Sequence, residues 1–190
     1  GGNGSTTNIS YFNIPTGGAV ADFGDMIGMF SEFGGVGDGA RIVTMGGYDN
    51  NKSPPRSDQI QYWASATTGN ALDFGNLTVA RYNAAGASSN TRVCMAAGEG
   101  TSKTNVIDYI TTASTGNATD FGDLGYSVQG PAGTSNGTRG LFAGGEPSSG
   151  NENFIEFITI ASTGNASNFG VLTVARNSMS CGSDAHGGIS

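Results

Sequence analysis

The sequence predicts an all-β protein made of repeated four-stranded antiparallel sheets, and three observations support this prediction. One segment, Ile107–Gly122, reads Ile-Asp-Tyr-Ile-Thr-Thr-Ala-Ser-Thr-Gly-Asn-Ala-Thr-Asp-Phe-Gly and recurs in similar form at Ile9–Gly24, Ile60–Gly75 and Ile155–Gly170. The Phe residues of these segments lie 51, 47 and 48 residues apart, and a period near fifty is typical of β-propeller repeats. No segment combines apolar residues at helical spacing with a helix cap and a stop, and the many Gly and Thr residues disfavour helices.

The continuous period predicts a single domain over residues 1-190 rather than two short ones. We place four repeats of about 48 residues at approximately 1-57, 58-104, 105-152 and 153-190, the last completed by the N-terminus. The strict spacing of the apolar anchors argues against disorder, although Gly contributes 33 residues and charged residues only 12%.

Four strands are expected in each repeat, and the residues around Ile107 show the last two of them well. In Val106–Thr112, Ile107, Tyr109 and Thr111 alternate with Asp108 and Ile110, which is the period of a strand. The pair Gly116-Asn117 then favours a tight hairpin into a returning strand, as do Gly69-Asn70 and Gly164-Asn165 in other repeats. The first two strands are read as a run of small residues, for example Ala132 and Gly133, followed by Thr138–Ala143.

Aromatic residues at equivalent positions are predicted to form the contacts between blades. The Phe anchors and the aromatic residues of the third strands are expected to be buried together: Phe23, Phe74, Phe121 and Phe169 with Tyr11, Tyr62, Tyr109 and Phe157. Radial repetition would cover the sheet faces and leave few exposed edges.

The order of residues within a unit resembles the kelch repeat of β-propellers. Each unit has an Arg early in the second strand, then a Gly-Gly doublet or its variant, an Ile-acidic-aromatic strand, and finally Ala-Arg. The residues are Arg41, Arg92 and Arg139; Gly46-Gly47, Ala97-Gly98 and Gly144-Gly145; Ile107-Asp108-Tyr109 and Ile155-Glu156-Phe157; Ala80-Arg81 and Ala175-Arg176. Phe replaces the kelch Trp near the start of the last strand in every copy. The resemblance still implies the propeller fold, since Phe can fill the same hydrophobic role, but it does not imply a particular kelch function.

The two chain ends are expected to complete one repeat. Residues 185–190, read onward into residues 1–4, align with Thr138–Pro147, and His186 then takes the place of Arg139. We therefore predict four blades in this chain, closed by pairing of the two termini, with the ends adjacent in space.

Charge and residue content exclude several kinds of function. A net charge of −7 with only eight Lys and Arg residues disfavours nucleic acid as a partner, and no apolar run is long enough for a membrane helix. One His cannot supply an imidazole-rich metal site, so no metal and no cofactor is expected. Cys94 and Cys181 are interpreted as two small buried thiols.

The repeated Asp-Phe-Gly-Asp motifs, at Asp22–Asp25 and Asp120–Asp123, leave two interpretations open. They could bind calcium through carboxylates. The simpler interpretation is an Asx turn, in which the first Asp accepts hydrogen bonds from nearby backbone N–H groups.

The repeated phrase Ala-Ser-Thr-Gly-Asn-Ala, followed by Leu-Thr-Val-Ala-Arg, also resembles kelch-like repeats of predicted virion proteins of aquatic bacteriophages. This resemblance implies a non-enzymatic structural or receptor-binding module of a virion or extracellular assembly. Its partners would be other virion or cell-surface proteins, or a surface glycan, without membrane insertion. The alternative is a carbohydrate-active enzyme or a lectin, for which Glu32, Glu99 and Glu146 are the candidate acids.

The binding surface is predicted where the repeats differ most. The loop between the second and third strands varies in length and sequence, and it should lie on the same face as the connection to the next blade. The residues expected to crowd that rim are Tyr48, Asp49, Lys52, Arg56, Glu99, Lys103 and Glu146.

Overall fold

A computed structural model describes residues 7–183, and in that range the chain contains fourteen strands and no helix. The first sheet pairs only β1 (Asn8–Tyr11) with β2 (Ala21–Asp25). Each of the next three sheets is a four-stranded antiparallel meander. Their strands are β3 (Gly34–Gly37), β4 (Arg41–Tyr48), β5 (Arg56–Ala64) and β6 (Leu72–Asn76); β7 (Ala85–Ser88), β8 (Arg92–Ala96), β9 (Thr104–Thr111) and β10 (Thr119–Val128); and β11 (Ala132–Ser135), β12 (Arg139–Ala143), β13 (Phe154–Thr159) and β14 (Ser167–Val171).

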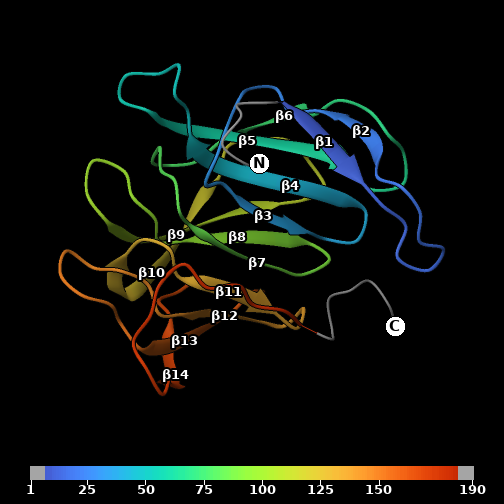
Figure 1. Cartoon of the computed structure of the whole chain (residues 1–190). Helices are drawn as coiled ribbons and strands as arrows, with labels where there is room; N and C mark the ends of the chain where they lie inside the picture. Colours follow the sequence, from blue (N-terminus) through green and yellow to red (C-terminus); the bar gives the residue numbers. More distant parts are fainter. Residues whose placement is uncertain (1–6, 184–190) are drawn as a thin grey trace.

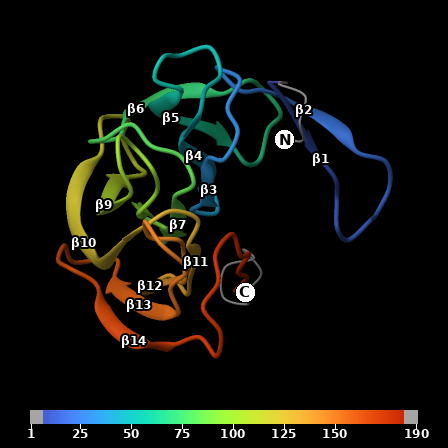
Figure 2. The same cartoon turned by 60° about the vertical axis from the view of Figure 1, so that its left-hand side comes forward.

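The four sheets follow one another around an arc, like the blades of a propeller (Figure 1). Figure 2 shows β3, β7 and β11 nearest the centre of the arc, whereas β6, β10 and β14 lie at its periphery. A core of buried apolar side chains fills each space between neighbouring sheets, for example Phe74, Leu77 and Met95 between the second and third sheets. The predicted all-β propeller of four-stranded blades is therefore confirmed.

Small residues form the first strand of each complete blade, as the sequence predicted, and these innermost strands approach one another closely. A methyl group at Gly133 would lie 2.5 Å from the carbonyl oxygen of Gly86, and one at Gly86 would lie 2.4 Å from a Val36 methyl. Both distances are below van der Waals contact, so a larger side chain would force the blades apart.

Backbone hydrogen bonds between corner residues tie the blades together around the centre. Asn83 N donates to Glu32 O, Gly130 N to Asn83 O, and Ser178 N to Gly130 O, each at 2.8 Å. All four corners have φ between 51° and 60°. This left-handed conformation costs a non-glycine residue energy, so the hydrogen bonds stabilise a corner that the local sequence does not favour.

The hairpin of each complete blade binds the outer strand of the sheet before it. Gly116 N donates to Phe74 O at 2.7 Å and Ala118 N to Asn76 O at 2.8 Å, while Asn117 Oδ1 accepts from Asn76 N at 3.1 Å. The same three bonds join Gly69–Ala71 to β2 and Gly164–Ala166 to β10. These contacts explain why the Gly-Asn turn recurs: its main role is between blades.

The same contact requires glycine after the first three anchor Phe residues, whereas a Cβ at Gly170 would meet open space. A methyl group at Gly75 would lie 2.3 Å from the carbonyl oxygen of Gly116, and Gly75 has φ of 148°. The first Asp of each Asp-Phe-Gly-Asp motif forms the predicted Asx turn with this glycine. Asp22 Oδ1 accepts a hydrogen bond from Gly24 N, and Asp120 Oδ1 accepts one from Gly122 N.

Three of the four anchor Phe side chains are buried, as predicted. The exposed fraction is 8% for Phe23 and 3% for both Phe74 and Phe121, but 55% for Phe169, so the prediction is wrong for Phe169. The hairpin of a following blade covers the first three, and among residues 7–183 nothing equivalent covers the fourth. Each anchor packs edge-on against the aromatic residue of its third strand. These third-strand residues were expected to be buried. Tyr62, Tyr109 and Phe157 are half-buried, whereas Tyr11 is 43% exposed, so the prediction is wrong for Tyr11.

The Arg of each second strand stacks over the same aromatic residue. The guanidinium carbon lies 4.9 Å from the ring centroid of Tyr62 for Arg41, 4.7 Å from Tyr109 for Arg92, and 4.6 Å from Phe157 for Arg139. Arg92 also donates to Ile160 O of the next blade at 3.0 Å. The kelch-like Arg thus has a structural role within and between blades.

The predicted pairing of the two termini involves residues 185–190 and 1–4, which lie outside the described residues, as does His186. Within the described part, the β1–β2 sheet and the sheet that ends in β14 lie at opposite ends of the arc (Figure 2).

Candidate functional site

The three variable loops lie on one face, together with the connections between blades. They follow β4, β8 and β12 and project on the left of Figure 1. Antiparallel bridges join Ser31 to Tyr48, Tyr82 to Glu99, and Gln129 to Glu146, so each connection pairs with a loop base. The predicted position of the loops is confirmed, and we name this surface the loop face.

Side chains of neighbouring loops bind one another across the loop face. Arg56 Nη1 donates to the carbonyl oxygen of Gly100, which joins the first complete blade to the second. Lys103 Nζ donates to Glu146 Oε1 at 3.0 Å and to Pro147 O at 2.7 Å, which joins the second blade to the third. Loops that differ in sequence therefore form one connected surface.

The Lys103–Glu146 pair is only partly shielded from water. The Lys103 side chain is 14% exposed and that of Glu146 is 39% exposed. A hydrogen bond from Lys103 and its positive charge hold the pKa of Glu146 below its ordinary value, with smaller help from Gln129 and Asn177. Glu146 is thus an ionised, structurally engaged carboxylate and a poor general acid.

Two tyrosines and two carboxylates come together near the centre of the loop face. The rings of Tyr48 and Tyr82 meet edge to face, with centroids 5.2 Å apart and planes at 90°. Partial burial raises the pKa of Tyr82, and so do the charge and hydrogen bond of Glu99 and the charge of Glu32. Tyr82 and Glu32 complete this group, although the sequence placed neither of them in the predicted rim.

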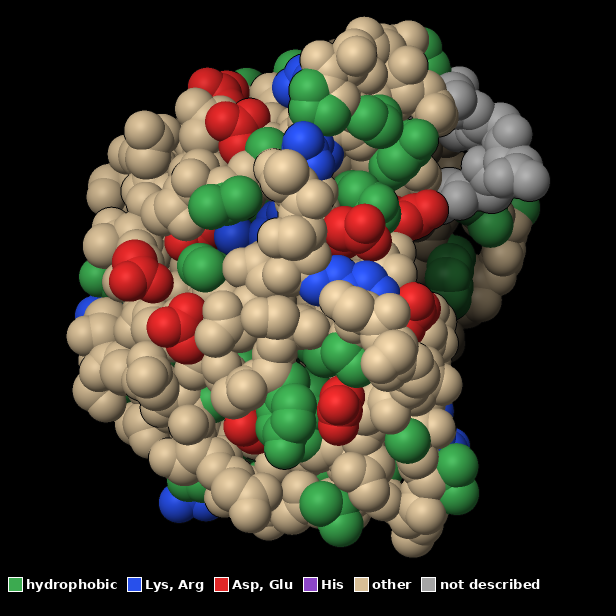
Figure 3. Space-filling view, turned by 90° about the vertical axis from the view of Figure 1, so that its left-hand side faces the viewer, with side chains coloured by type: hydrophobic (Ala, Val, Ile, Leu, Met, Phe, Trp, Pro, Cys, Tyr) green, Lys and Arg blue, Asp and Glu red, His purple; other side chains and the backbone are tan. Residues whose placement is uncertain are grey.

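The remaining predicted residues, Asp49 and Lys52, differ in exposure. The side chain of Lys52 is exposed, whereas Asp49 is 7% exposed and its Oδ1 accepts from Asn51 N at 2.9 Å. Asp49 therefore shapes its loop from within, and Lys52 is the member available to a partner. Figure 3 looks onto the loop face and shows basic, acidic and hydrophobic side chains interspersed over it.

A buried ion pair beneath the loop face was not predicted. Arg81 Nη1 lies 2.9 Å from Asp108 Oδ2, and both side chains are 0% exposed. Asp108 also accepts from Thr78 N and Oγ1, and Arg81 Nη2 donates to Met95 O at 3.1 Å. Burial lowers the pKa of the Arg81 guanidinium, and the charge and hydrogen bond of Asp108 oppose this effect.

The sequence contained a signal for this pair, because both residues vary together between repeats. In the same register, Phe30 and Gln61 take these two places in the preceding interface, and Val128 and Glu156 take them in the following one. A backbone N–H four residues after the anchor Phe donates to the Gln61, Asp108 or Glu156 side chain in all three. Among the three interfaces of the described residues, only the middle one has a cation, Arg81, at this position.

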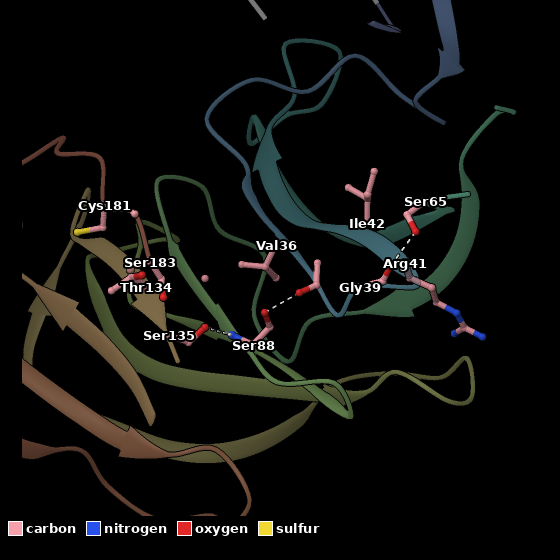
Figure 4. Close-up of a pocket in the computed structure, with 14 residues that line it drawn as sticks. Val36, Gly39, Arg41, Ile42, Ser65, Ser88, Thr134, Ser135, Cys181 and Ser183 are labelled. Atoms are coloured by element: carbon pink, nitrogen blue, oxygen red, sulfur yellow. Dashed lines mark hydrogen bonds between the residues drawn. The ribbon is translucent and has the colours of Figure 1, made fainter. Parts of the chain in front are cut away.

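A pocket of about 590 Å³ opens near the axis, at the opposite ends of the inner strands. Figure 4 shows Val36, Ser88 and Thr134 on its wall, with Arg41 directed away from its centre. Ser88 Oγ donates to Gly37 O at 2.7 Å, and Ser88 N donates to Ser135 Oγ at 3.0 Å. No Asp or Glu is among the described residues that line it, so these residues do not provide the paired carboxylates of a glycosidase.

Neither cysteine forms a disulfide. Cys94 is buried, as predicted, and burial raises the pKa of its thiol to about 12. Cys181 is exposed at the rim of the axial pocket, so the prediction of a buried thiol is wrong there. Within residues 7–183, no three His, Cys, Asp or Glu side chains are grouped to hold a metal ion, and no helix could span a membrane.

Comparison with known proteins identifies the fold. No protein-family model matches the chain, and no curated protein sequence is similar to it at a significant level. The chain is similar in structure to YjhT, a kelch-repeat β-propeller protein, with a TM-score of 0.73 and 10% sequence identity over 91% of this chain. It spans 64% of the YjhT chain. At this identity the likeness concerns the fold alone: the chain has the architecture of a β-propeller with four-stranded antiparallel blades.

Proposed function

We propose that this chain is a non-enzymatic binding module that presents its loop face to a protein or glycan in a virion or extracellular assembly. The observation that carries the proposal is the connection of the loops across blades, through Arg56 to Gly100 and through Lys103 to Glu146. Surfaces ordered before binding lose less conformational entropy when the partner arrives, which favours recognition.

The chemistry of the loop face supports recognition as well. Tyr48 and Tyr82 offer large rings that need little ordering, and Lys52 adds an exposed cation. Aromatic and charged groups of this kind commonly supply most of the affinity of a binding surface. The virion setting rests on the sequence resemblance to phage kelch-like repeats alone.

The second candidate function is a lectin or a carbohydrate-active enzyme. The observation that favours it is the position of Glu32 and Glu99 beside Tyr82, where both raise the pKa of the phenol. An aromatic ring flanked by carboxylates can stack on a sugar and accept hydrogen bonds from its hydroxyl groups.

The proposal can be tested with the fluorescently labelled chain and three probes: washed bacterial cells, purified lipopolysaccharide and a glycan array. We expect binding to at least one probe, weakened tenfold or more when Tyr48→Ala and Lys52→Ala are combined. A Thr115→Ala variant is the matched control, since Thr115 is exposed on a hairpin away from the loop face, and it should bind as the parent does.

Absence of binding to all three probes, or equal binding by the loop-face variant, would overturn the proposal. If the chain cleaves any arrayed glycan, and Glu32→Gln or Glu99→Gln abolishes that cleavage, the chain is a carbohydrate-active enzyme instead. Thermal unfolding of each variant separates lost binding from lost folding.

A further inference from the structure

Two aromatic rings and two carboxylates meet on the loop face, where the first complete blade adjoins the second. The rings of Tyr48 and Tyr82 stand at 90°, with centroids 5.2 Å apart. Glu99 is joined to Tyr82 by two backbone hydrogen bonds, of 3.1 and 2.8 Å, and Asn83 N donates to Glu32 O at 2.8 Å. We name Glu32, Tyr48, Tyr82 and Glu99 the tyrosine–glutamate group.

Neither carboxylate of this group is neutralised by an ion pair in the part of the chain that the structure describes. Two ion pairs occur within residues 7–183, and neither includes Glu32 or Glu99. The bases of the neighbouring loops have other acceptors: Arg56 donates to a backbone carbonyl, and Lys103 binds Glu146 of the next blade. Negative charge therefore remains at the tyrosine pair and is available to a partner.

The equivalent position of the next interface already holds an ammonium group. Tyr82 bridges to Glu99 as Gln129 bridges to Glu146, so Glu146 takes the place of Glu99. Lys103 Nζ lies 3.0 Å from Glu146 Oε1. The carboxylate at this place in the repeat can thus bind a lysine ammonium, and at Glu99 two tyrosine rings stand beside it instead.

The backbone of Glu32 gives a second reason to assign this group a role. Its φ of 55° is a left-handed conformation that short side chains and glycine adopt most easily. The equivalent corners are Asn83, Gly130 and Ser178. Burial raises the pKa of Tyr82, and so do the charge and hydrogen bond of Glu99 and the charge of Glu32. A carboxylate kept at an unfavourable backbone position therefore adds negative charge beside the tyrosines.

We propose that the tyrosine–glutamate group binds the ammonium of a lysine side chain on a partner protein. This inference rests on the proposed function, because it names the chemical group that the loop face recognises. The faces of aromatic rings attract cations and carboxylates pair with them, and both attractions strengthen when a bound partner excludes water. The Lys103–Glu146 contact shows the same chemistry within the chain.

An NMR titration of the isotope-labelled chain with Nα-acetyl-lysine methylamide tests the site directly. We expect saturable shifts of the backbone N–H signals of Tyr48, Tyr82 and Glu99, and no saturable shift with the neutral Nε-acetylated derivative of the probe. Glu99→Gln and Tyr82→Leu should each weaken binding about 2- to 5-fold, as expected for one exposed ion pair or one cation–π contact. Asp73→Asn is the matched control, since it removes the same charge from an exposed position where the fourth sheet has Asn168, and it should bind as the parent does.

Three results would overturn the proposal: no saturable shift on the loop face, equal weakening by Asp73→Asn, or full binding by Tyr82→Leu. The last two would show general charge attraction without a site. The spectra report whether each variant is folded, and Tyr48→Leu replaces Tyr82→Leu if the latter unfolds.

The titration also separates this inference from the proposed function. If the loop face binds cells, lipopolysaccharide or a glycan but does not bind the lysine probe, the proposed function stands and the lysine site is wrong. If the probe binds at the tyrosine–glutamate group while all three of those partners fail to bind, the site stands and the proposed function is wrong.

Discussion

Phe121 and Phe169 occupy the same position in two successive blades, yet their surroundings differ completely. Both rings pack edge-on against a third-strand aromatic residue, Tyr109 for the first and Phe157 for the second. Phe121 is 3% exposed because the Gly164-Asn165 hairpin lies over it, whereas Phe169 is 55% exposed. Burial of the anchor is therefore made by the following blade and not by the strand that carries it.

The same difference separates other equivalent pairs. Arg81 is buried against Asp108 of the next blade, whereas Arg176, at the same place after β14, is exposed. A repeat protein of this kind gains its stability from interfaces between neighbours, so a residue's energetic role depends on whether it has a neighbour.

The largest difference is expected between Phe121→Ala and Phe169→Ala. The first removes a buried ring and leaves a cavity, which should lower the free energy of unfolding by about 3–5 kcal/mol. The second alters an exposed ring and should change it by no more than about 0.5 kcal/mol at concentrations where the chain is monomeric. Urea unfolding monitored by circular dichroism measures both; equal losses would show that Phe169 is covered in solution.

Replacing the buried guanidinium should cost nearly as much. Arg81→Met leaves the Asp108 carboxylate buried without a cation, and breaking such a pair typically costs about 3–5 kcal/mol. We expect the lower end of this range, because Thr78 still donates two hydrogen bonds to Asp108. Arg176→Met is the control at the open end, and it should be nearly neutral.

The double variant Arg81→Phe/Asp108→Gln sharpens this comparison. It transplants the Phe30 and Gln61 pair, which fills the same two positions in the first interface without charge. We expect it to recover most of the stability lost by Arg81→Met. If the double variant is no more stable than Arg81→Met, then the Phe and Gln pair stabilises only the first interface, where Phe30 and Gln61 occur.

A moderate effect is expected for the hairpin amide. Asn117→Ala removes the acceptor of the Asn76 N–H and should lower the free energy of unfolding by about 0.5–1.5 kcal/mol. Ala19→Asn adds the same amide to the hairpin between β1 and β2, which covers no blade among the described residues, so the free energy of unfolding should not change. Thermal unfolding of both variants at low protein concentration checks the pair.

The smallest effect concerns the exposed Lys103–Glu146 contact. Lys103 holds the pKa of Glu146 below its ordinary value of 4.5, so folding favours the carboxylate. The resulting stabilisation is complete above that ordinary value and is lost as the pH falls through the lower folded-state pKa. The stability difference between the parent and Glu146→Gln should therefore be constant at neutral pH and narrow below pH 4.5; a difference that widens in acid would contradict the contact.

The sequence alone determined the elements and their order. Alternation in Val106–Thr112 and the Gly-Asn turn are local properties, so they predicted the strands and hairpins of each blade. The run of small residues at Ala132 and Gly133 likewise predicted the first strand of its blade, and the structure shows how closely this strand approaches its neighbours. The face that carries the variable loops followed from the connectivity of an antiparallel meander.

Only the tertiary structure decided which residues meet across blades. Arg81 and Asp108 lie 27 positions apart, and their contact depends on how two blades pack. Tyr82 and Glu32 entered the loop-face group for the same reason, since the corner hydrogen bonds bring successive connections together. Because the four anchor Phe residues hold equivalent positions in the repeat, the sequence predicted that all four are buried. The exposure of an anchor depends on the blade that follows it, and among the described residues no blade covers the outer side of Phe169.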